Sequence, residues 1–185
     1  MKKNIFLSFF IFLSVSINAQ ENNESDLSSK ANEIKIAAFK AVIYPALELE
    51  YERLLSKNTS VGANIAYVFN DDHPFYDFYT DAYFRFYFNE KKEYGMNGFF
   101  AQPYLSFLSK QDTYDYYGIQ PLDYSYPTGS GSYNTMGFGF ALGKKWTNSN
   151  GFTLQAILGL GRNFTEKSHF EEIIPRFDVF LGYRF

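Results

Sequence analysis

The residues of this chain best suited to chemistry are Ser168 and His169, which have Glu166, Glu171 and Glu172 close by in the sequence. A serine, a histidine and a carboxylate are the parts of an acyl-transfer site, in which the histidine acts as base for the serine nucleophile. Neighbouring side chains on an extended chain point in opposite directions, so Ser168 and His169 would not face one another. We therefore interpret this stretch as a polar loop and expect no catalytic residue in it.

A second polar stretch, Asp71-Asp72-His73, could ligate a hard divalent cation such as calcium. Such cations usually need more oxygen ligands than one short loop supplies, and the following Pro74 makes a turn the simpler interpretation. The glycines within residues 128–132 do not form a phosphate-binding loop, because no strand-to-helix context and no following lysine accompany them. We expect neither a metal site nor a cofactor.

Charged residues recur at alternate positions of several segments, and their charges balance. The densest run is Glu48, Glu50 and Glu52, whose spacing puts three carboxylates on one face of a strand. Three buried carboxylates so close together require cationic partners, because an unpaired buried charge is costly. Arg85, Arg176 and Arg184 are the expected partners of these glutamates. The predicted network holds five residues of each sign: Lys35, Arg85, Lys145, Arg176 and Arg184 against Glu48, Glu50, Glu52, Asp81 and Asp178.

These charges lie on eight segments that alternate between apolar and polar side chains, which is the pattern of half-buried strands. In the last segment the odd-numbered residues from Phe177 to Phe185 share one face, and Phe180 is the only large apolar residue on the other. An even number of strands of about 9–11 residues is typical of bacterial outer-membrane barrels. The predicted strands are residues 33–39, 44–54, 60–69, 80–89, 99–109, 135–146, 152–162 and 176–185.

The connections between these segments differ in length. Those at 56–59, 90–98 and 147–151 are turns, whereas those at 71–79, 110–134 and 163–174 are longer; the first connection, at 40–43, is short. Outer-membrane barrels have short periplasmic turns and longer extracellular loops, so we expect both termini in the periplasm.

The longest connection, residues 110–134, is rich in tyrosine. Exposed tyrosines are efficient contact residues, so this loop is our candidate for recognition of an extracellular protein or glycan. The alternative is an aromatic collar that extends the barrel. The candidate residues are Tyr114, Tyr116, Tyr117, Tyr124 and Tyr126.

The start of the chain predicts export. Lys2 and Lys3 precede an apolar run at residues 5–17, and Ala19 is a small residue suited to signal cleavage. The run is too short for a membrane helix of about 20 residues. The chain has no cysteine, which excludes disulfides, thiolate metal sites and a lipid-anchored lipoprotein. The predicted organisation is a cleaved signal peptide at 1–19, a flexible periplasmic lead at 20–32 and a barrel at 33–185.

Composition agrees with a barrel. Loss of Lys2 and Lys3 from 17 basic residues leaves 15 against 20 acidic ones, a net charge of −5, which argues against nucleic-acid binding. The chain has 22 Phe and 16 Tyr, yet its mean hydropathy is −0.27. Many aromatics at low mean hydropathy are typical of strands with one apolar face.

Alternation alone does not decide which face points outward. A secreted lipocalin-like barrel would turn the apolar face inward, around an apolar ligand. Bulky aromatics at strand ends, such as Trp146 and Phe185, instead favour contact with a membrane interface. Small residues on the polar face, such as Gly137 and Gly139, suit the narrow lumen of eight strands. We therefore predict an all-β, eight-stranded antiparallel up-and-down transmembrane β-barrel with a lumen plugged by side chains.

From residue 33 to residue 185 the chain resembles small eight-stranded bacterial outer-membrane barrels such as the OmpA membrane domain and OmpX. The signal ending at Ala19, the eight alternating segments and the terminal run 176–185 carry this resemblance. Residues 44–55 also resemble the second strand of outer-membrane barrels of uncharacterised function. The resemblance implies the outer membrane of a Gram-negative bacterium, contact with lipid and lipopolysaccharide, and insertion by the barrel-assembly machinery, which recognises the last strand and Phe185.

We expect a monomer with a structural or surface-interaction role through its outer loops, and not an enzyme. Three alternatives stay open. One is a small pore, another is a lipid-modifying enzyme similar to lipid A acyl hydrolases that would use Ser168 and His169, and the third is a secreted lipocalin-like binder of apolar ligands.

Overall fold

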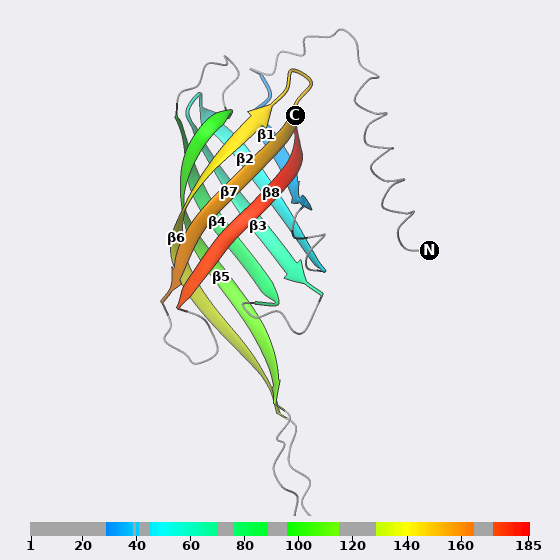
Figure 1. Ribbon diagram of the computed structural model, residues 1–185, viewed down its shortest axis with the longest axis vertical. Helices are drawn as coiled ribbons and strands as arrows, with labels where there is room; N and C mark the ends of the chain where they lie inside the picture. The colour runs from blue at the N-terminus through cyan, green and yellow to red at the C-terminus, as the bar shows by residue number, and fades with distance from the viewer. Residues whose placement is uncertain are drawn as a thin grey trace, which may run out of the picture.

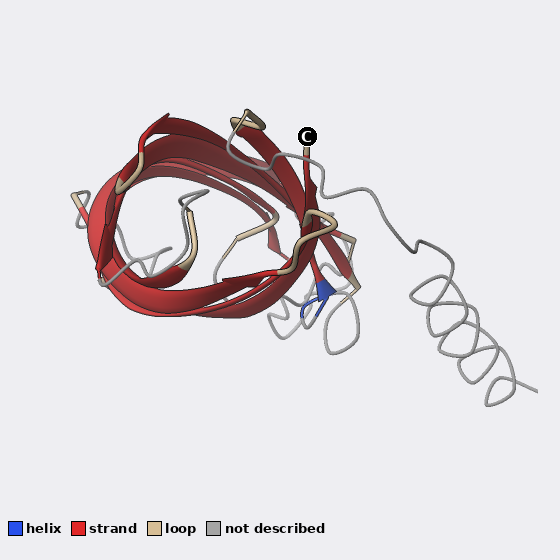
Figure 2. Cartoon of the chain, turned by 90° about the horizontal axis from the view of Figure 1, so that it is seen from above, coloured by secondary structure: helices blue, strands red, loops and turns tan. Residues whose placement is uncertain are grey.

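A computed structural model of the chain describes residues 29–38, 40, 45–69, 76–88, 96–114, 129–164 and 172–185. Within these ranges eight strands pair antiparallel with their sequence neighbours, and β1 pairs with β8 to close the barrel (Figures 1 and 2). The predicted all-β, eight-stranded antiparallel barrel is thereby confirmed. The strands are β1 (Asn32–Ala37), β2 (Ala46–Ser56), β3 (Thr59–Val68), β4 (Phe78–Phe88), β5 (Gly98–Tyr114), β6 (Gly129–Thr147), β7 (Phe152–Asn163) and β8 (Ile173–Arg184).

The alternation of side chains determines what faces the interior. In β2, Leu47, Leu49 and Tyr51 are exposed, whereas Glu48 and Glu50 between them are buried. The other strands alternate in the same way, so that apolar side chains cover most of the outside, while charged, polar and aromatic side chains fill the inside. No helix within the described ranges is long and apolar enough to cross a membrane.

The two ends of the barrel differ. At one end, called here the Phe185 end, lie the C-terminus and the tight β2–β3 and β6–β7 turns (Figure 1). At the opposite end β5 and β6 stay paired as far as Tyr114 and Gly129, beyond the last β5 partner on β4 at Ser109. The two-stranded extension formed by residues 110–114 and 129–134 is called here the β5–β6 ribbon, and its end of the barrel the ribbon end.

Short polar side chains build the turns at the Phe185 end. Asn148 Oδ1 accepts hydrogen bonds from the backbone N–H groups of Asn150 (3.0 Å) and Phe152 (2.9 Å). Gly151 has φ of 91°, a left-handed conformation that glycine adopts without steric cost, and its N–H donates to the Asn148 carbonyl (3.1 Å). The sequence Asn-Ser-Asn-Gly therefore determines how β6 turns into β7.

The structure corrects several predicted boundaries, among them the start of β4, which is Phe78 rather than Thr80. The loop expected at 110–134 is strand at both ends, where the β5–β6 ribbon takes 110–114 and 129–134. β8 begins at Ile173 rather than Arg176, and β1 ends at Ala37; Phe39 lies outside the described residues. The ribbon escaped prediction because a strand that has left the barrel wall has no buried face, and its sequence need not alternate.

Aromatic rings fill the lumen by lying over glycines on neighbouring strands. Tyr104 faces Gly139 across β5–β6, and a Cβ atom on Gly139 would come within 2.2 Å of the Tyr104 ring. Phe100 faces Gly143 in the same way, at 2.3 Å. Because no side chain larger than hydrogen fits beneath these rings, the inward glycines are needed for close packing of a narrow interior.

β1 is so short that it covers only half of the β8 edge. Its pairing with β8 ends at Ala37 opposite Phe180, although β8 continues to Ile173. Phe185 exchanges backbone hydrogen bonds with Asn32 of β1, and bonding directions alternate along a strand, so odd-numbered residues of β8 point their N–H toward β1. Pro175 is therefore directed toward the part of this edge that β1 does not reach, and it has no N–H to leave unpaired there.

Candidate functional site

The most distinctive site in the described residues is the charged interior of the barrel. The ten charged residues of the predicted network all lie in the lumen with no more than 5% of their surface exposed. All of them except Arg184, together with Glu33 and Lys40, form two groups along the barrel axis. The Arg85 cluster, nearer the Phe185 end, contains Glu33, Lys35, Glu50, Glu52, Arg85 and Lys145. The Arg176 cluster, nearer the ribbon end, contains Lys40, Glu48, Asp81, Arg176 and Asp178.

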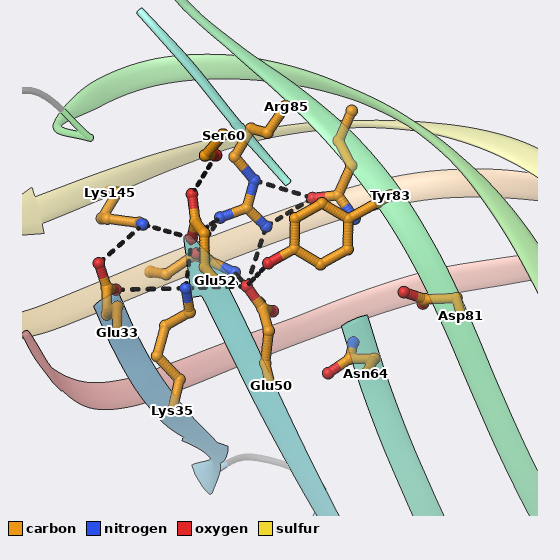
Figure 3. A network of polar contacts seen from close by, with 12 residues as sticks. Glu33, Lys35, Glu50, Glu52, Ser60, Asn64, Asp81, Tyr83, Arg85 and Lys145 are labelled. Atoms are coloured by element: carbon orange, nitrogen blue, oxygen red, sulfur yellow. Dashed lines mark hydrogen bonds and ion pairs between the residues drawn. The ribbon is translucent and has the colours of Figure 1, made fainter. Parts of the chain in front are cut away.

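Glu52 is the centre of the Arg85 cluster (Figure 3). Its Oε2 atom receives the ammonium groups of Lys35 (2.5 Å) and Lys145 (2.6 Å) and the guanidinium Nη1 of Arg85 (2.6 Å). These three cations come from β1, β6 and β4, while Glu52 is on β2. One carboxylate thus joins four strands of the barrel.

Glu33 and Glu50 balance the remaining positive charge of this cluster. Lys35 Nζ lies 2.8 Å from Glu50 and 3.2 Å from Glu33, and Lys145 Nζ lies 3.1 Å from Glu33. Three carboxylates therefore meet three cations, all without solvent exposure. Buried ions are tolerated only when they are paired and hydrogen-bonded, and this arrangement meets that condition.

Neutral groups hold the Arg85 guanidinium in place. Its Nε and Nη2 donate to Gln102 Oε1 (2.9 and 2.5 Å), and its Nη1 also donates to Gln155 Oε1 (2.7 Å). The guanidinium carbon lies 4.1 Å from the centroid of the Phe100 ring and 4.6 Å from that of Tyr83, within the range of cation–π attraction. Arg85 is thus fixed by side chains of β5 and β7 and by Tyr83 of its own strand.

Hydroxyl groups also donate to Glu50 and Glu52 of β2. Tyr87 Oη and Ser60 Oγ donate to Glu52 Oε1 at 2.6 and 2.5 Å, and Tyr83 Oη donates to Glu50 Oε1 at 2.6 Å. The two glutamates closest to Arg85 therefore accept hydrogen bonds from ions and hydroxyls together. Such a network of paired polar groups rigidifies this layer of the lumen.

The Arg176 cluster is less fully satisfied. Arg176 forms an ion pair with Asp81, whose Oδ2 also accepts from Tyr79 Oη (2.5 Å). Within the described residues, Asp81 Oδ1 and Arg176 Nη2 have no hydrogen-bond partner. Glu48 accepts from Asn64 Nδ2 at 2.8 Å. This layer is held by separate pairs rather than by one shared carboxylate.

Lys40 links two strands that do not pair with each other. Its ammonium forms an ion pair with Glu48 of β2 and lies 3.3 Å from Asp178 Oδ2 of β8. These strands flank β1, which has already ended at Ala37. The side chain is 19% exposed, so Lys40 lies at the boundary between the lumen and the outside. An ion bridge therefore connects β2 and β8 where the β1 ladder is missing.

Two arginines have partners other than the predicted ones, and two residues of the buried charge network were not predicted. The arginines were expected beside the β2 glutamates, and Arg85 lies there, but Arg176 pairs with Asp81 of β4 and Arg184 Nε donates to the Lys30 carbonyl at 2.8 Å. The missed residues are Glu33 and Lys40. Glu33 has the same parity as Lys35 and could have been found from alternation, whereas Lys40 lies beyond the end of its strand.

Other candidates fall largely outside the described residues. Of the five candidate tyrosines, Tyr114 lies on a described strand, at the tip of the β5–β6 ribbon, and Tyr116, Tyr117, Tyr124 and Tyr126 lie outside the described residues. Asp71-Asp72-His73, Ser168 and His169 also lie outside them. Glu172 forms an exposed ion pair with Arg162 (2.6 Å). In the described part of the chain, no group of three or more His, Cys, Asp or Glu residues is arranged to hold a metal ion.

Fold and site together define a closed eight-stranded barrel with a mostly apolar outward face and a network of buried charges in its interior. The chain belongs to the family described as "Protein of unknown function (DUF3575)", whose model matches residues 5–176. No curated protein and no solved structure matches the chain.

Proposed function

We propose that this protein is an integral outer-membrane barrel, similar to the OmpA membrane domain and OmpX, with a lumen filled by side chains. In this proposal it acts structurally or offers its outer loops for surface interaction. The observation that carries the proposal is the distribution of charge between the two faces of the barrel wall.

The outward face is apolar over its whole middle section. On the described strands, outside the β5–β6 ribbon, the outward positions are charged only near the rims, at Arg53 and Lys144 near the Phe185 end and at Arg162 near the ribbon end. Between them Leu158 is 66% exposed and Leu105 59% exposed. An apolar surface of this extent is unfavourable in water and is what a hydrocarbon environment requires.

Strand length supports the same environment. β2 and β4 have 11 residues each. At about 3.3 Å per residue and a tilt of about 40°, such a strand covers roughly 28 Å along the barrel axis. The hydrophobic band of outer-membrane barrels is about 25 Å tall.

The opposite arrangement, expected for the lipocalin-like alternative, would need a lumen lined mainly by apolar side chains around a ligand. Here the lumen centres on the Arg85 cluster, which suits neither an apolar ligand nor a continuous water path. This favours a plugged barrel over both the ligand binder and the small pore.

The Phe185 end would face the periplasm, because the start of β1, the C-terminus and the tight turns lie there and the predicted signal peptide would deliver the chain to that side. The β5–β6 ribbon would then point away from the cell and carry the tyrosine-rich connection. Insertion by the barrel-assembly machinery and contact with lipopolysaccharide follow from this topology.

Membrane insertion can be tested directly. Expressed with its own signal peptide in a Gram-negative host, the protein should fractionate with the outer membrane and resist extraction by urea. After purification it should migrate differently in gels before and after boiling, as folded barrels do. Recovery as a soluble monomer without detergent would overturn the proposal.

The surface role is tested separately. Replacing residues 115–128 by an Asn-Gly turn should leave membrane insertion intact and reduce the adhesion of expressing cells to immobilised glycans or proteins. Equal adhesion by cells with the complete and the shortened protein would argue against recognition through this loop.

A further inference from the structure

We infer that Phe99, Lys144 and Trp146 form a binding site for the phosphate of an anionic phospholipid headgroup. The inference rests on the proposed membrane location and deepens it by naming the lipid class held at one position of the wall.

The three side chains form a compact outward-facing group near the Phe185 end. Phe99 of β5 is directly opposite Lys144 of β6, and Trp146 follows two residues later on the same face. Lys144 Nζ lies 4.7 Å from the centroid of the Phe99 ring and 5.0 Å from that of Trp146. Phe99 and Trp146 are both exposed, so the cation lies beside two aromatic groups that contact the surroundings of the barrel.

This group has the physical character of a membrane interface. Phenylalanine and tryptophan rings at strand ends prefer the boundary between hydrocarbon and headgroups. A lysine at the same depth keeps its apolar stem along the wall and turns its ammonium toward the headgroup layer. The ammonium, held between two rings, is then at the level of lipid phosphates.

The charge on Lys144 is available to an anion. Among the described residues no carboxylate forms an ion pair with it, in contrast to Arg162 near the ribbon end, whose guanidinium is 2.6 Å from Glu172. A cation and an aromatic ring meet a second time near the Phe185 end, where Lys30 Nζ lies 5.7 Å from the Tyr183 ring centroid. Among the described residues, cations without a carboxylate partner therefore lie beside aromatic rings at this end of the barrel.

The proposed topology selects the source of the phosphate. The Phe185 end faces the periplasm, and the periplasmic leaflet of an outer membrane consists of phospholipids. An anionic headgroup such as that of phosphatidylglycerol carries the charge that complements Lys144. A basic residue near an anionic lipid surface strengthens the binding of the protein to that surface by about fivefold.

The chain provides its own reporter, because Trp146 is its only tryptophan. The purified protein is folded into phosphatidylcholine vesicles that contain a small fraction of lipid with brominated acyl chains, which quench tryptophan fluorescence on contact. Brominated phosphatidylglycerol is compared with brominated phosphatidylcholine at equal fractions. The two variants are Lys144→Gln, which removes the proposed charge, and Arg53→Gln, a matched control that removes a rim cation from β2.

We expect the wild-type protein and Arg53→Gln to be quenched more strongly by brominated phosphatidylglycerol, with a relative association constant about fivefold above that of phosphatidylcholine. Lys144→Gln should lose this preference while keeping the same quenching by phosphatidylcholine. Equal quenching by both lipids in the wild type, or an unchanged preference in Lys144→Gln, would overturn the lipid site and leave the membrane proposal standing. Absence of quenching by either lipid would overturn the membrane location itself.

Discussion

Lys145 Nζ and Glu52 Oε2 lie 2.6 Å apart and join opposite walls of the barrel. Lys145 is on β6 and Glu52 on β2, and three strands separate these two in either direction around the closed sheet. Because Arg85 and Lys35 bind the same oxygen atom, the contact is part of a brace across the lumen. Its consequences for stability can be measured.

Replacing Arg85 by Met should destabilise the barrel by about 3–5 kcal/mol, because Glu50 and Glu52 would lose a buried cationic partner. The measurement is the free energy of unfolding by urea in lipid vesicles. Arg162→Met is the matched control, since its ion pair with Glu172 is exposed and worth about 0–1 kcal/mol. Similar losses for both variants would contradict a special role for the lumen network.

The Arg176 cluster should behave as a separable pair. Asp81→Asn and Arg176→Gln each leave one buried charge without its partner, whereas the double variant removes both charges. We therefore expect the double variant to be more stable than the sum of the single effects predicts, by about 1–3 kcal/mol. Strict additivity in urea unfolding would show that the two side chains do not interact energetically.

Lys40 should hold the wall together between β2 and β8. Lys40→Met removes the ion bridge to Glu48 and Asp178, whereas Lys40→Arg can keep it. The chain has no cysteine, so Ala66→Cys can report access to the ribbon half of the lumen and Gln102→Cys access to the other half. In Lys40→Met we expect faster maleimide labelling at position 66 and unchanged labelling at position 102. An equal rate at position 66 with lysine and with methionine would refute the bridge.

The outward face offers a test of its surroundings. Leu158→Arg, in the middle of β7, should cost about 2–4 kcal/mol in a bilayer, because a charge would lie at the centre of the hydrocarbon. Leu55→Arg, at the Phe185 end of β2, should cost about 0–1 kcal/mol. The two leucines are similarly exposed, so a soluble barrel would tolerate both changes equally. Unfolding of both variants in vesicles distinguishes the two cases.

Alternation predicted most of the architecture because a period of two records which face of a strand is polar. It located the inward glutamates of β2 and Phe180, which is fully buried despite lying on the polar face. It could not show the partner of Arg176, because the contact with Asp81 crosses the lumen and depends on barrel geometry rather than on spacing. The same holds for Lys40, whose role depends on where β1 ends.

The shortness of β1 has a mechanical consequence. β1 is held by five register pairs on each side, and it contributes both Glu33 and Lys35 to the Arg85 cluster. Under a pulling force applied to the N-terminus, this strand would be the first to peel away, and the same step would withdraw an acid and a base from the cross-lumen brace. Loss of the wall and loss of its internal support would then be a single rupture event.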